Sequence, residues 1–285
     1  MENTKINVII PTYNAGEEFR EVLGILVKQT GLAKTDILVV DSSSSDNTQA
    51  IVKDAGVSLI VIPQKEFGHG KTRKFAAEQA GDVDVVIFMT QDALAYDKNT
   101  IKNIVAYFAK DEKLSAVYGR QIPYAETDIF GKHARLFNYK EQSSIKSLDD
   151  RKKYGIKTTF FSDTFGAYRK DVLEELGSFP DVQFSEDACM AGKMLIAGYK
   201  IGYCAEAKVY HSHTFSVWEE FKRYREIGRF YRQESWLLDT FGKAEGEGLK
   251  FVKSQAKYLL DNGKWYLLPE LVVRNGMKYL GYKLG

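Results

Sequence analysis

The stretch KINVIIPTYNAGEEFREVLGILVKQTGLAKTDILVVD, residues 5–41, decides the fold class. Residues 5–14 form an apolar run that Pro11 ends, which predicts a buried strand. Residues 16–30 then place apolar side chains at helical spacing, and residues 35–41 form a second apolar run before a polar loop. Strand, helix and strand in this order predict a right-handed crossover between two parallel strands.

The same alternation continues along the chain. VSLIVI (57–62), VDVVIFMTQDA (83–93) and LSAVYGRQIP (114–123) predict three more strands, with helical patterns between them. We therefore expect an α/β protein with a doubly wound, mostly parallel sheet and helices on both of its faces. Ligands of such sheets bind beyond the carboxyl ends of the strands. The polar segments that follow these ends are Thr12–Asn14, Asp41–Asp46, Phe67–Arg73 and Thr90–Asp92.

Composition narrows the class of protein. The 285 residues carry a net charge of +2, which gives no general reason to expect nucleic acid as a partner. The two cysteines, Cys189 and Cys204, suggest no disulfide framework and do not have the spacing of a metal site. We expect both to be reduced thiols in a cytoplasmic protein. No stretch reaches the ~18 apolar residues that span a bilayer. We expect a cytoplasmic chain that at most lies on a membrane surface.

The second half of the chain is less regular. Residues 124–165 mix charged and aromatic side chains without an apolar face, and we interpret them as a mobile surface insertion. Helices are expected from Val217 to about Leu238, and over 247–261 and 265–280. Thr214 to Gly285 hold 13 Lys and Arg against 9 Asp and Glu, so this segment is basic and is expected to be a helical C-terminal extension.

FGHGKTRK, residues 67–74, stands between a predicted strand and a predicted helix, as a phosphate-binding P-loop does. Lys65 occupies the position where a P-loop needs its first glycine, which closes the turn that aims backbone N–H groups at phosphate. Arg73 likewise stands where the dinucleotide fingerprint G-x-G-x-x-G needs its last glycine. Both motifs are therefore rejected.

Six stretches in order resemble the inverting glycosyltransferases of family 2, which have the GT-A fold. The resemblance runs from Ile6 to His213, and FGHGKTRK and TQDA make the chain similar to the rhamnosyltransferase group within the family. The six stretches are VIIPTYN (8–14), ILVVDSSSSDNT (37–48), GHGKTRKFAAEQA (68–80), VIFMTQDA (86–93), FSEDACMAGKMLIAGYKIGY (184–203) and VYHSH (209–213).

This resemblance implies a set of donor-binding residues along the strand ends. Asp41 would accept a hydrogen bond from a uracil or thymine ring N–H, and Arg73 would approach the nucleotide. A turn-starting role for Asp41 and a solvated helix face for Arg73 remain open. The other implied donor-binding residues are Pro11, Thr12, Tyr13, Ser43, Gly70, Thr90, Gln91 and Asp92.

The resemblance also implies a metal site and a catalytic base. Asp92 matches the last aspartate of the family's D-x-D turn and would bind Mg²⁺ or Mn²⁺, with His211 or His213 completing the site; Thr90 replaces the first aspartate. Asp187, with Glu186 beside it, would act as the general base, because an inverting transfer needs one carboxylate to take the acceptor proton. An acidic helix N-terminus is the alternative reading of this pair.

We expect residues 1–213 to form the nucleotide-sugar-binding catalytic domain and residues 214–285 to face acceptor or membrane. The resemblance implies transfer of L-rhamnose from dTDP-L-rhamnose to a lipid-linked saccharide, at the inner face of the cell membrane, for a cell-surface polysaccharide. Arg225 and Arg229 share a helix face and could bind diphosphate, acceptor or anionic lipid, or could simply be solvated. Transfer from a UDP-hexose or a UDP-amino sugar, and a non-catalytic nucleotide-sugar-binding or scaffold protein, remain alternatives.

Overall fold

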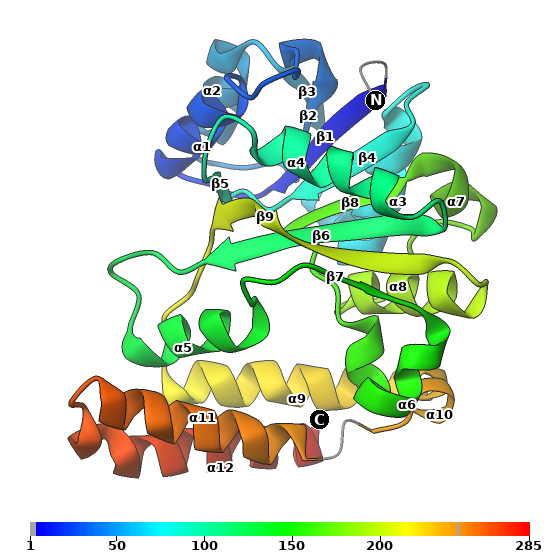
Figure 1. Cartoon of the computed structure of the whole chain (residues 1–285). Coiled ribbons are helices and arrows are strands. Elements are labelled where there is room, and N and C mark those ends of the chain that lie inside the picture. Colours follow the sequence, from blue (N-terminus) through cyan, green and yellow to red (C-terminus); the bar gives the residue numbers. More distant parts are fainter. Residues whose placement is uncertain (1–3, 244–245) are drawn as a thin grey trace. The chain divides into compact units, whose positions relative to one another are not determined.

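The computed structural model describes residues 4–243 and 246–285 (Figure 1). The chain divides into two compact units. The first unit comprises the chain up to Gln121 together with residues 141–148 and 159–211. The second unit comprises residues 122–140, 149–158 and 212–285. Residues 1–3 of the expected catalytic domain and residues 244–245 of the expected C-terminal extension lie outside the described residues.

A nine-stranded sheet with the order β3-β2-β1-β4-β8-β6-β9-β5 lies at the centre of the first unit, and β7 pairs with β9. Strands β2 and β4 are buried along their whole length, which explains why both read as continuous apolar runs. The strands are β1 (Ile6–Thr12), β2 (Ile37–Asp41), β3 (Ser58–Val61), β4 (Val85–Met89), β5 (Leu94–Ala95), β6 (Leu114–Ile122), β7 (Ser144–Lys146), β8 (Phe165–Arg169) and β9 (Lys200–Tyr210).

The α/β class is confirmed, but the sheet is mixed rather than mostly parallel. Strands β1, β2, β3 and β4 pair in parallel, as the strand and helix alternation predicted. Strand β8 enters between β4 and β6 and is antiparallel to both. Sequence patterning did not reveal this, because a short apolar strand reads the same in either direction.

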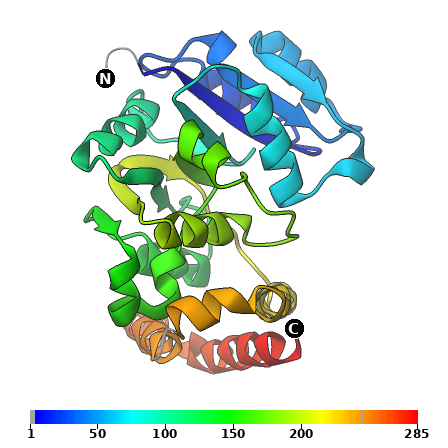
Figure 2. The ribbon, with the colours of Figure 1, turned by 90° about the vertical axis from the view of Figure 1, so that its right-hand side faces the viewer.

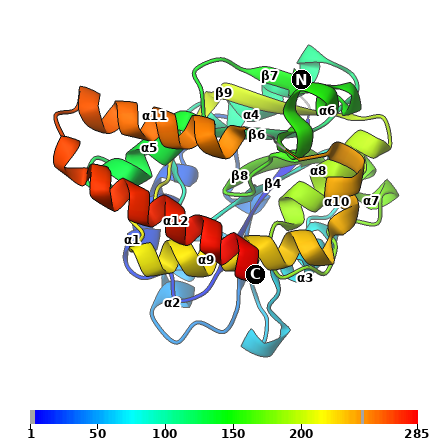
Figure 3. The ribbon, with the colours of Figure 1, turned by 90° about the horizontal axis from the view of Figure 1, so that it is seen from below.

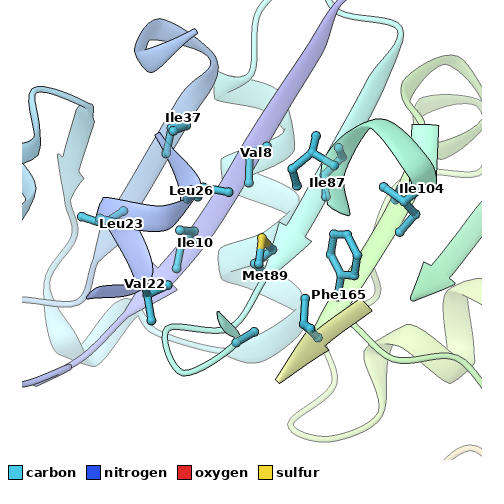
Figure 4. Packing of buried hydrophobic residues seen from close by; sticks show 14 of the residues in the cluster. Val8, Ile10, Val22, Leu23, Leu26, Ile37, Ile87, Met89, Ile104 and Phe165 are labelled. Atoms are coloured by element: carbon cyan, nitrogen blue, oxygen red, sulfur yellow. The ribbon is translucent and has the colours of Figure 1, made fainter. Parts of the chain in front are cut away.

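Helices cover both faces of the first strands (Figures 1 and 2). Alternation along the strands sends Val8, Ile10 and Ile87 to one face, where they pack with Leu23 and Ile104 (Figure 4). On the other face the Phe88 ring contacts Tyr168, Phe179 and the Arg73 guanidinium. The helices of this unit are α1 (Glu18–Leu26), α2 (Thr48–Ala55), α3 (His69–Gln79), α4 (Thr100–Tyr107), α7 (Lys170–Glu175) and α8 (Glu186–Ile196).

The second unit is helical, as expected for the C-terminal segment. Its longest helices, α9 and α12, lie side by side (Figure 3). Gly228 and Gly281 permit this close packing, because a Cβ on either would meet a backbone oxygen of the partner helix within 2.5 Å. The helices are α5 (Ile129–Asn138), α6 (Arg151–Tyr154), α9 (Val217–Gln233), α10 (Ser235–Phe241), α11 (Glu247–Asp261) and α12 (Leu268–Leu284).

Residues 124–165 are not the irregular surface insertion that their mixed pattern suggested. They contain α5, β7 and α6, and Phe130 of α5 is buried in a small core with Leu259 and Leu271. Asp128 caps α5 by accepting a hydrogen bond from the backbone N–H of Gly131. No helix in the described part of the chain is long and apolar enough to cross a membrane.

Candidate active site

The ends of β1 and β4 are tied together by one side chain. The Gln91 amide oxygen accepts a hydrogen bond from the Tyr13 N–H at 2.9 Å, and its Nε2 donates to the Tyr13 carbonyl at 3.3 Å. Thr12 is buried, whereas Tyr13 is 43% exposed and available to a ligand. The family resemblance implied that Gln91 contacts the donor. In this structure its side chain holds the backbone of Tyr13 in place.

Asp41 at the end of β2 is fully buried and already accepts several hydrogen bonds. The Thr12 hydroxyl donates at 3.0 Å, the Ser44 N–H and the Gln49 Nε2 each donate at 2.9 Å, and the Ser44 hydroxyl donates as well. The predicted hydrogen bond from a nucleobase N–H thus requires one of these donors, such as the Gln49 amide, to move. Ser43 is exposed at a positive φ of 57°, and its hydroxyl donates to the Ile62 carbonyl.

Gly70 sits where α3 passes the Pro180 segment. A Cβ on Gly70 would lie 1.8 Å from the Pro180 carbonyl oxygen and 3.5 Å from the Glu186 Cβ, so only glycine fits. Gly70 therefore sets how closely α3 approaches the start of α8. This contact was not foreseen, because it joins segments about a hundred residues apart in the chain.

Arg73, one turn further along α3, is buried between two carboxylates. Its Nη1 lies 2.6 Å from the Glu186 Oε1 and its Nε lies 3.0 Å from the Asp163 Oδ2. All three side chains are at most 7% exposed. The solvated helix face that the sequence left open for Arg73 is excluded, and its guanidinium is committed to these carboxylates.

The acidic pair Glu186-Asp187 begins α8, as its sequence predicted. Ser185 precedes the pair in a left-handed conformation (φ 56°) and makes no side-chain cap. The Asp187 Oδ1 accepts from the Ala188 N–H at 2.7 Å, and its Oδ2 accepts from the Asp163 N–H at 3.3 Å. A non-glycine residue held at positive φ next to a carboxylate pair is the kind of strain that gathers at functional sites.

The Asp187 carboxyl group has an unusually high pKa. Burial is the main cause and the neighbouring Glu186 carboxylate the second, and together they raise the pKa of Asp187 to about 7. A carboxylate with a pKa near the working pH is well suited to general base catalysis. The physical setting therefore fits the base role assigned to Asp187 by resemblance.

Asp92, in the turn after β4, faces His211 at the end of β9. The His211 Nε2 lies 3.4 Å from the Asp92 Oδ2, and its Nδ1 lies 2.9 Å from the Gln121 Oε1. Gln121 Nε2 donates to the Ser162 hydroxyl at 2.9 Å. With the amide in this orientation, its oxygen accepts from the His211 Nδ1–H, and the Nε2 of the neutral ring faces the Asp92 carboxylate.

A cation between these two acceptors, either a proton or a metal ion, would be favourable for both. A carboxylate oxygen with an imidazole nitrogen suits Mn²⁺ well, and the carboxylate alone suits Mg²⁺. Asp92 and His211 are the candidate ligands within the first unit, and the family resemblance adds His213. The Thr90 hydroxyl, two residues before Asp92 in the chain, is buried and has no hydrogen-bond partner among the described residues. The donor set therefore fits the metal expected from the resemblance.

Three of the predicted site residues belong to the second unit. His213 follows His211 by two positions, just past the start of that unit. Arg225 and Arg229 are both exposed on α9, where Arg229 pairs with Glu226 at 3.1 Å. Their exposure is consistent with a solvated face and with an anionic partner alike.

Comparison with known proteins gives the family. The protein family described as "Glycosyl transferase family 2" matches residues 7–177, more than half of the chain. The chain belongs to glycosyltransferase family 2. It is a glycosyltransferase, as the ordered motifs predicted, and a non-catalytic scaffold is no longer needed as an alternative.

Two similar relatives of this glycosyltransferase come from Salmonella. The O-antigen chain rhamnosyltransferase RfbN of Salmonella typhimurium strain LT2 is 45% identical over 99% of this chain and 89% of its own length. The O-antigen chain rhamnosyltransferase WbaN of Salmonella anatum is 43% identical over 98% of this chain and 88% of its own length. The similarity to the rhamnosyltransferase group is therefore confirmed.

Two solved structures share the fold of this glycosyltransferase. The mannosyltransferase PcManGT from Pyrobaculum calidifontis, in complex with GDP-Man and Mn²⁺, has a TM-score of 0.68 at 18% identity and covers 98% of this chain and 86% of its own. TarS residues 1–349 from S. aureus, in complex with UDP-GlcNAc, has a TM-score of 0.57 at 19% identity, with 98% and 90% covered.

The sequence did not single out Gln121, Ser162 or Asp163 of this glycosyltransferase. Site residues were predicted only in the segments that follow the carboxyl ends of parallel strands. Because β8 is antiparallel to β4, the residues that precede β8 lie at the same edge as the residues that follow β4. The polar segment SDT (162–164) before the apolar FGAY was the available signal.

Proposed function

We propose that this glycosyltransferase transfers L-rhamnose from dTDP-L-rhamnose to a lipid-linked saccharide during assembly of a cell-surface polysaccharide. The observation that carries the proposal is the similarity to RfbN and WbaN over nearly the whole length of all three chains. Identity of 43–45% without large gaps in coverage supports a shared sugar donor more strongly than the distant structural neighbours do.

Asp187 is the proposed general base. As the acceptor hydroxyl oxygen attacks the anomeric carbon, its proton passes to the Asp187 carboxylate. The bond from the anomeric carbon to the nucleoside diphosphate breaks on the opposite face, and its electron pair stays on the diphosphate oxygen. One direct displacement inverts the anomeric centre. Glu186 is unsuited to this role because Arg73 holds its carboxylate at 2.6 Å.

The donor side of the site is proposed at the ends of β1, β2 and β4. Tyr13 is exposed there and would stack on the nucleobase, while Asp41 would bind a ring N–H after displacing the Gln49 amide. The remaining proposed members of the donor pocket are Pro11, Thr12, Ser43, Gly70, Thr90 and Gln91.

Asp92, His211 and His213 are proposed to hold Mg²⁺ or Mn²⁺. Gln121 would keep the His211 Nε2 aimed at the ion through its own contact with the Nδ1. Such an ion would neutralise charge that develops on the leaving diphosphate. His213 is joined to His211 through Ser212 alone, so it stays close to this pair whatever the arrangement of the second unit.

The second unit offers a surface suited to membrane lipid. Helix α12 buries Leu271, Arg274, Lys278 and Gly281 on one face. Its opposite face exposes large apolar side chains, and Val272 is 68% exposed and Tyr279 65%. Lys250, Lys253 and Lys257 are exposed on α11 of the same unit. The outward apolar residues of α12, here called the α12 apolar face, are Val272, Val273, Tyr279, Leu280 and Leu284.

Exposed apolar and basic side chains within one unit fit an anionic membrane surface, which combines an apolar interior with negative head groups. We therefore propose that the enzyme lies on the inner face of the cell membrane, where its lipid-linked acceptor resides. Arg225 and Arg229 of α9 are proposed to bind the acceptor diphosphate or anionic head groups.

Vesicle binding tests this surface. The double variant V273D and L280D should weaken binding to phosphatidylglycerol vesicles by at least about tenfold, because it places charge where apolar contact is proposed. I196D, which changes an exposed apolar residue of the first unit, is the matched control. Equal binding of all three proteins would refute the membrane proposal without touching the donor proposal.

Donor identity is tested by thermal unfolding followed by transfer assays. Under dTDP-L-rhamnose the melting temperature should rise more than under UDP-glucose, UDP-galactose or UDP-N-acetylglucosamine, since a ligand stabilises the state it binds. Rhamnose should then appear on a lipid-linked saccharide acceptor. A response to a UDP-sugar alone would establish the UDP-hexose or UDP-amino-sugar alternative, which the fold shared with TarS leaves open.

A further inference from the structure

Asp163 is a buried carboxylate that neither the motifs nor the family roles assigned above account for. It stands just before β8 and is 2% exposed. Its Oδ2 lies 3.0 Å from the Arg73 Nε, and its Oδ1 accepts a hydrogen bond from the Tyr168 hydroxyl at 2.6 Å. Both carboxylate oxygens are thus engaged by groups of the protein itself.

Asp163 also reaches the acidic pair in two ways. Through Arg73 it shares one guanidinium with Glu186. Through its backbone N–H it donates a hydrogen bond to the Asp187 Oδ2. Residues from α3, from the loop before β8 and from the start of α8 therefore meet at one point.

The charges of this cluster do not balance. Three carboxylates, from Asp163, Glu186 and Asp187, surround the single Arg73 guanidinium. Uncompensated negative charge in a buried site is costly, so the group retains a proton at neutral pH. In keeping with this, burial raises the pKa of Asp163 well above its usual range.

Resting on the proposed function, we propose that Asp163 is a positioning residue for transfer. Together with Arg73 it holds Glu186 away from the acceptor and fixes the start of α8, so that Asp187 alone is free to take the acceptor proton. The Tyr168 hydroxyl fixes Asp163 in turn. The charged and titratable groups that face Asp187 in this arrangement are Glu186, Arg73, Asp163 and Tyr168.

Asp163→Asn is the main test, because it keeps the shape of the side chain and removes its carboxyl group. We expect kcat to fall by about 10²-fold while the donor dissociation constant stays within about twofold, as for loss of an interaction that acts only in the transition state. Tyr168→Phe, which removes only the hydroxyl, should show a smaller change in the same direction.

D171N is the matched control, since Asp171 is an exposed carboxylate that bonds Arg169 in the same unit. It should change neither kcat nor donor binding. Should D163N leave kcat as in wild type, or weaken donor binding as much as it lowers kcat, Asp163 is not a positioning residue.

The ¹³C carboxyl chemical shift of Asp187 at pH 8 gives a readout that needs no substrate. It should change in D163N, because the Asp163 side chain that fixes the backbone N–H donor to the Asp187 Oδ2 loses its contacts with Arg73 and Tyr168. It should stay unchanged in D171N. This measurement also separates the two proposals. If no donor supports transfer but the signal moves, the proposed function fails and the positioning of Asp187 by Asp163 stands. If D163N transfers at the wild-type rate and the signal does not move, only the inference about Asp163 fails.

Discussion

Arg73 of α3 and Glu186 of α8 form a buried ion pair, with 2.6 Å between Nη1 and Oε1. The two residues come from segments that the sequence identified separately, FGHGKTRK and FSEDACM. Because Arg73 binds Glu186, the two neighbouring acids differ in their surroundings: Glu186 is paired with a guanidinium, and Asp187 accepts only backbone hydrogen bonds among the contacts described above. This contact is the physical reason for assigning the base role to Asp187 rather than Glu186.

Replacing Asp187 by Asn should lower kcat by about 10²–10⁴-fold, because the acceptor proton loses its base. Donor affinity should change little, since the amide occupies the same volume. Initial rates of transfer and calorimetric donor binding measure the two effects. An Asp187→Asn enzyme that turns over at the wild-type rate would rule out this residue as the base.

Activity should fall about tenfold per pH unit below pH 7, because Asp187 must be ionised to accept a proton and burial raises its pKa to about 7. Glu186→Gln should move this limb to lower pH, since it removes a negative neighbour. The matched control is Glu174→Gln, at an exposed carboxylate of α7. A limb that stays in place in Glu186→Gln would contradict the prediction.

The same raised pKa affects stability with a definite sign. The unfolded Asp187 ionises near pH 4, whereas the folded one ionises near pH 7, so its contribution to stability is complete below about pH 4 and is lost as the pH rises through 7. Replacing Asp187 by Asn should therefore reduce the drop in unfolding free energy between pH 5 and pH 8. Urea unfolding at both pH values measures the difference; an equal drop in the two proteins would contradict it.

Gly70→Ala should reduce the free energy of unfolding by about 1–3 kcal/mol, because its Cβ would overlap the Pro180 carbonyl oxygen. It should also lower kcat, since the Pro180 segment leads into Glu186. Gly24→Ala in α1 is the control: nothing lies within 4 Å of its Cβ, and it should stabilise the helix by about 0.5–1 kcal/mol. Similar unfolding curves for both variants would show that the approach of α3 is not tight.

Gln121→Leu should weaken Mn²⁺ binding by about 10–100-fold, because His211 loses the group that orients its ring. Asp92→Asn should weaken it at least as much. Gln79→Leu, at an exposed glutamine of α3, should have no effect. Calorimetric titration with Mn²⁺ checks the order, and a chelator should inhibit transfer by the wild type; unchanged Mn²⁺ affinity in Gln121→Leu would argue against His211 as a ligand.

Much of the fold followed from local pattern. The parallel strands β1 to β4 and the helices between them have apolar residues at the spacing that each element requires, so sequence periodicity identified them. The direction of β8 was not predictable in this way, because it depends on which strand it pairs with. That direction brings Ser162 and Asp163 to the functional edge of the sheet.

The sequence by itself determined the α/β class, the order of the family motifs and the identity of the acidic pair, because each depends on neighbouring residues in the chain. Only the tertiary structure decided what those residues do to one another. Arg73 proved to be a buried partner of Glu186 and Asp163, Gly70 a close-packing position, and Gln121 the support of His211. Each of these contacts joins segments that are far apart in the chain. Burial at these contacts raises the pKa of Asp163 and Asp187, which their sequence neighbours alone do not indicate.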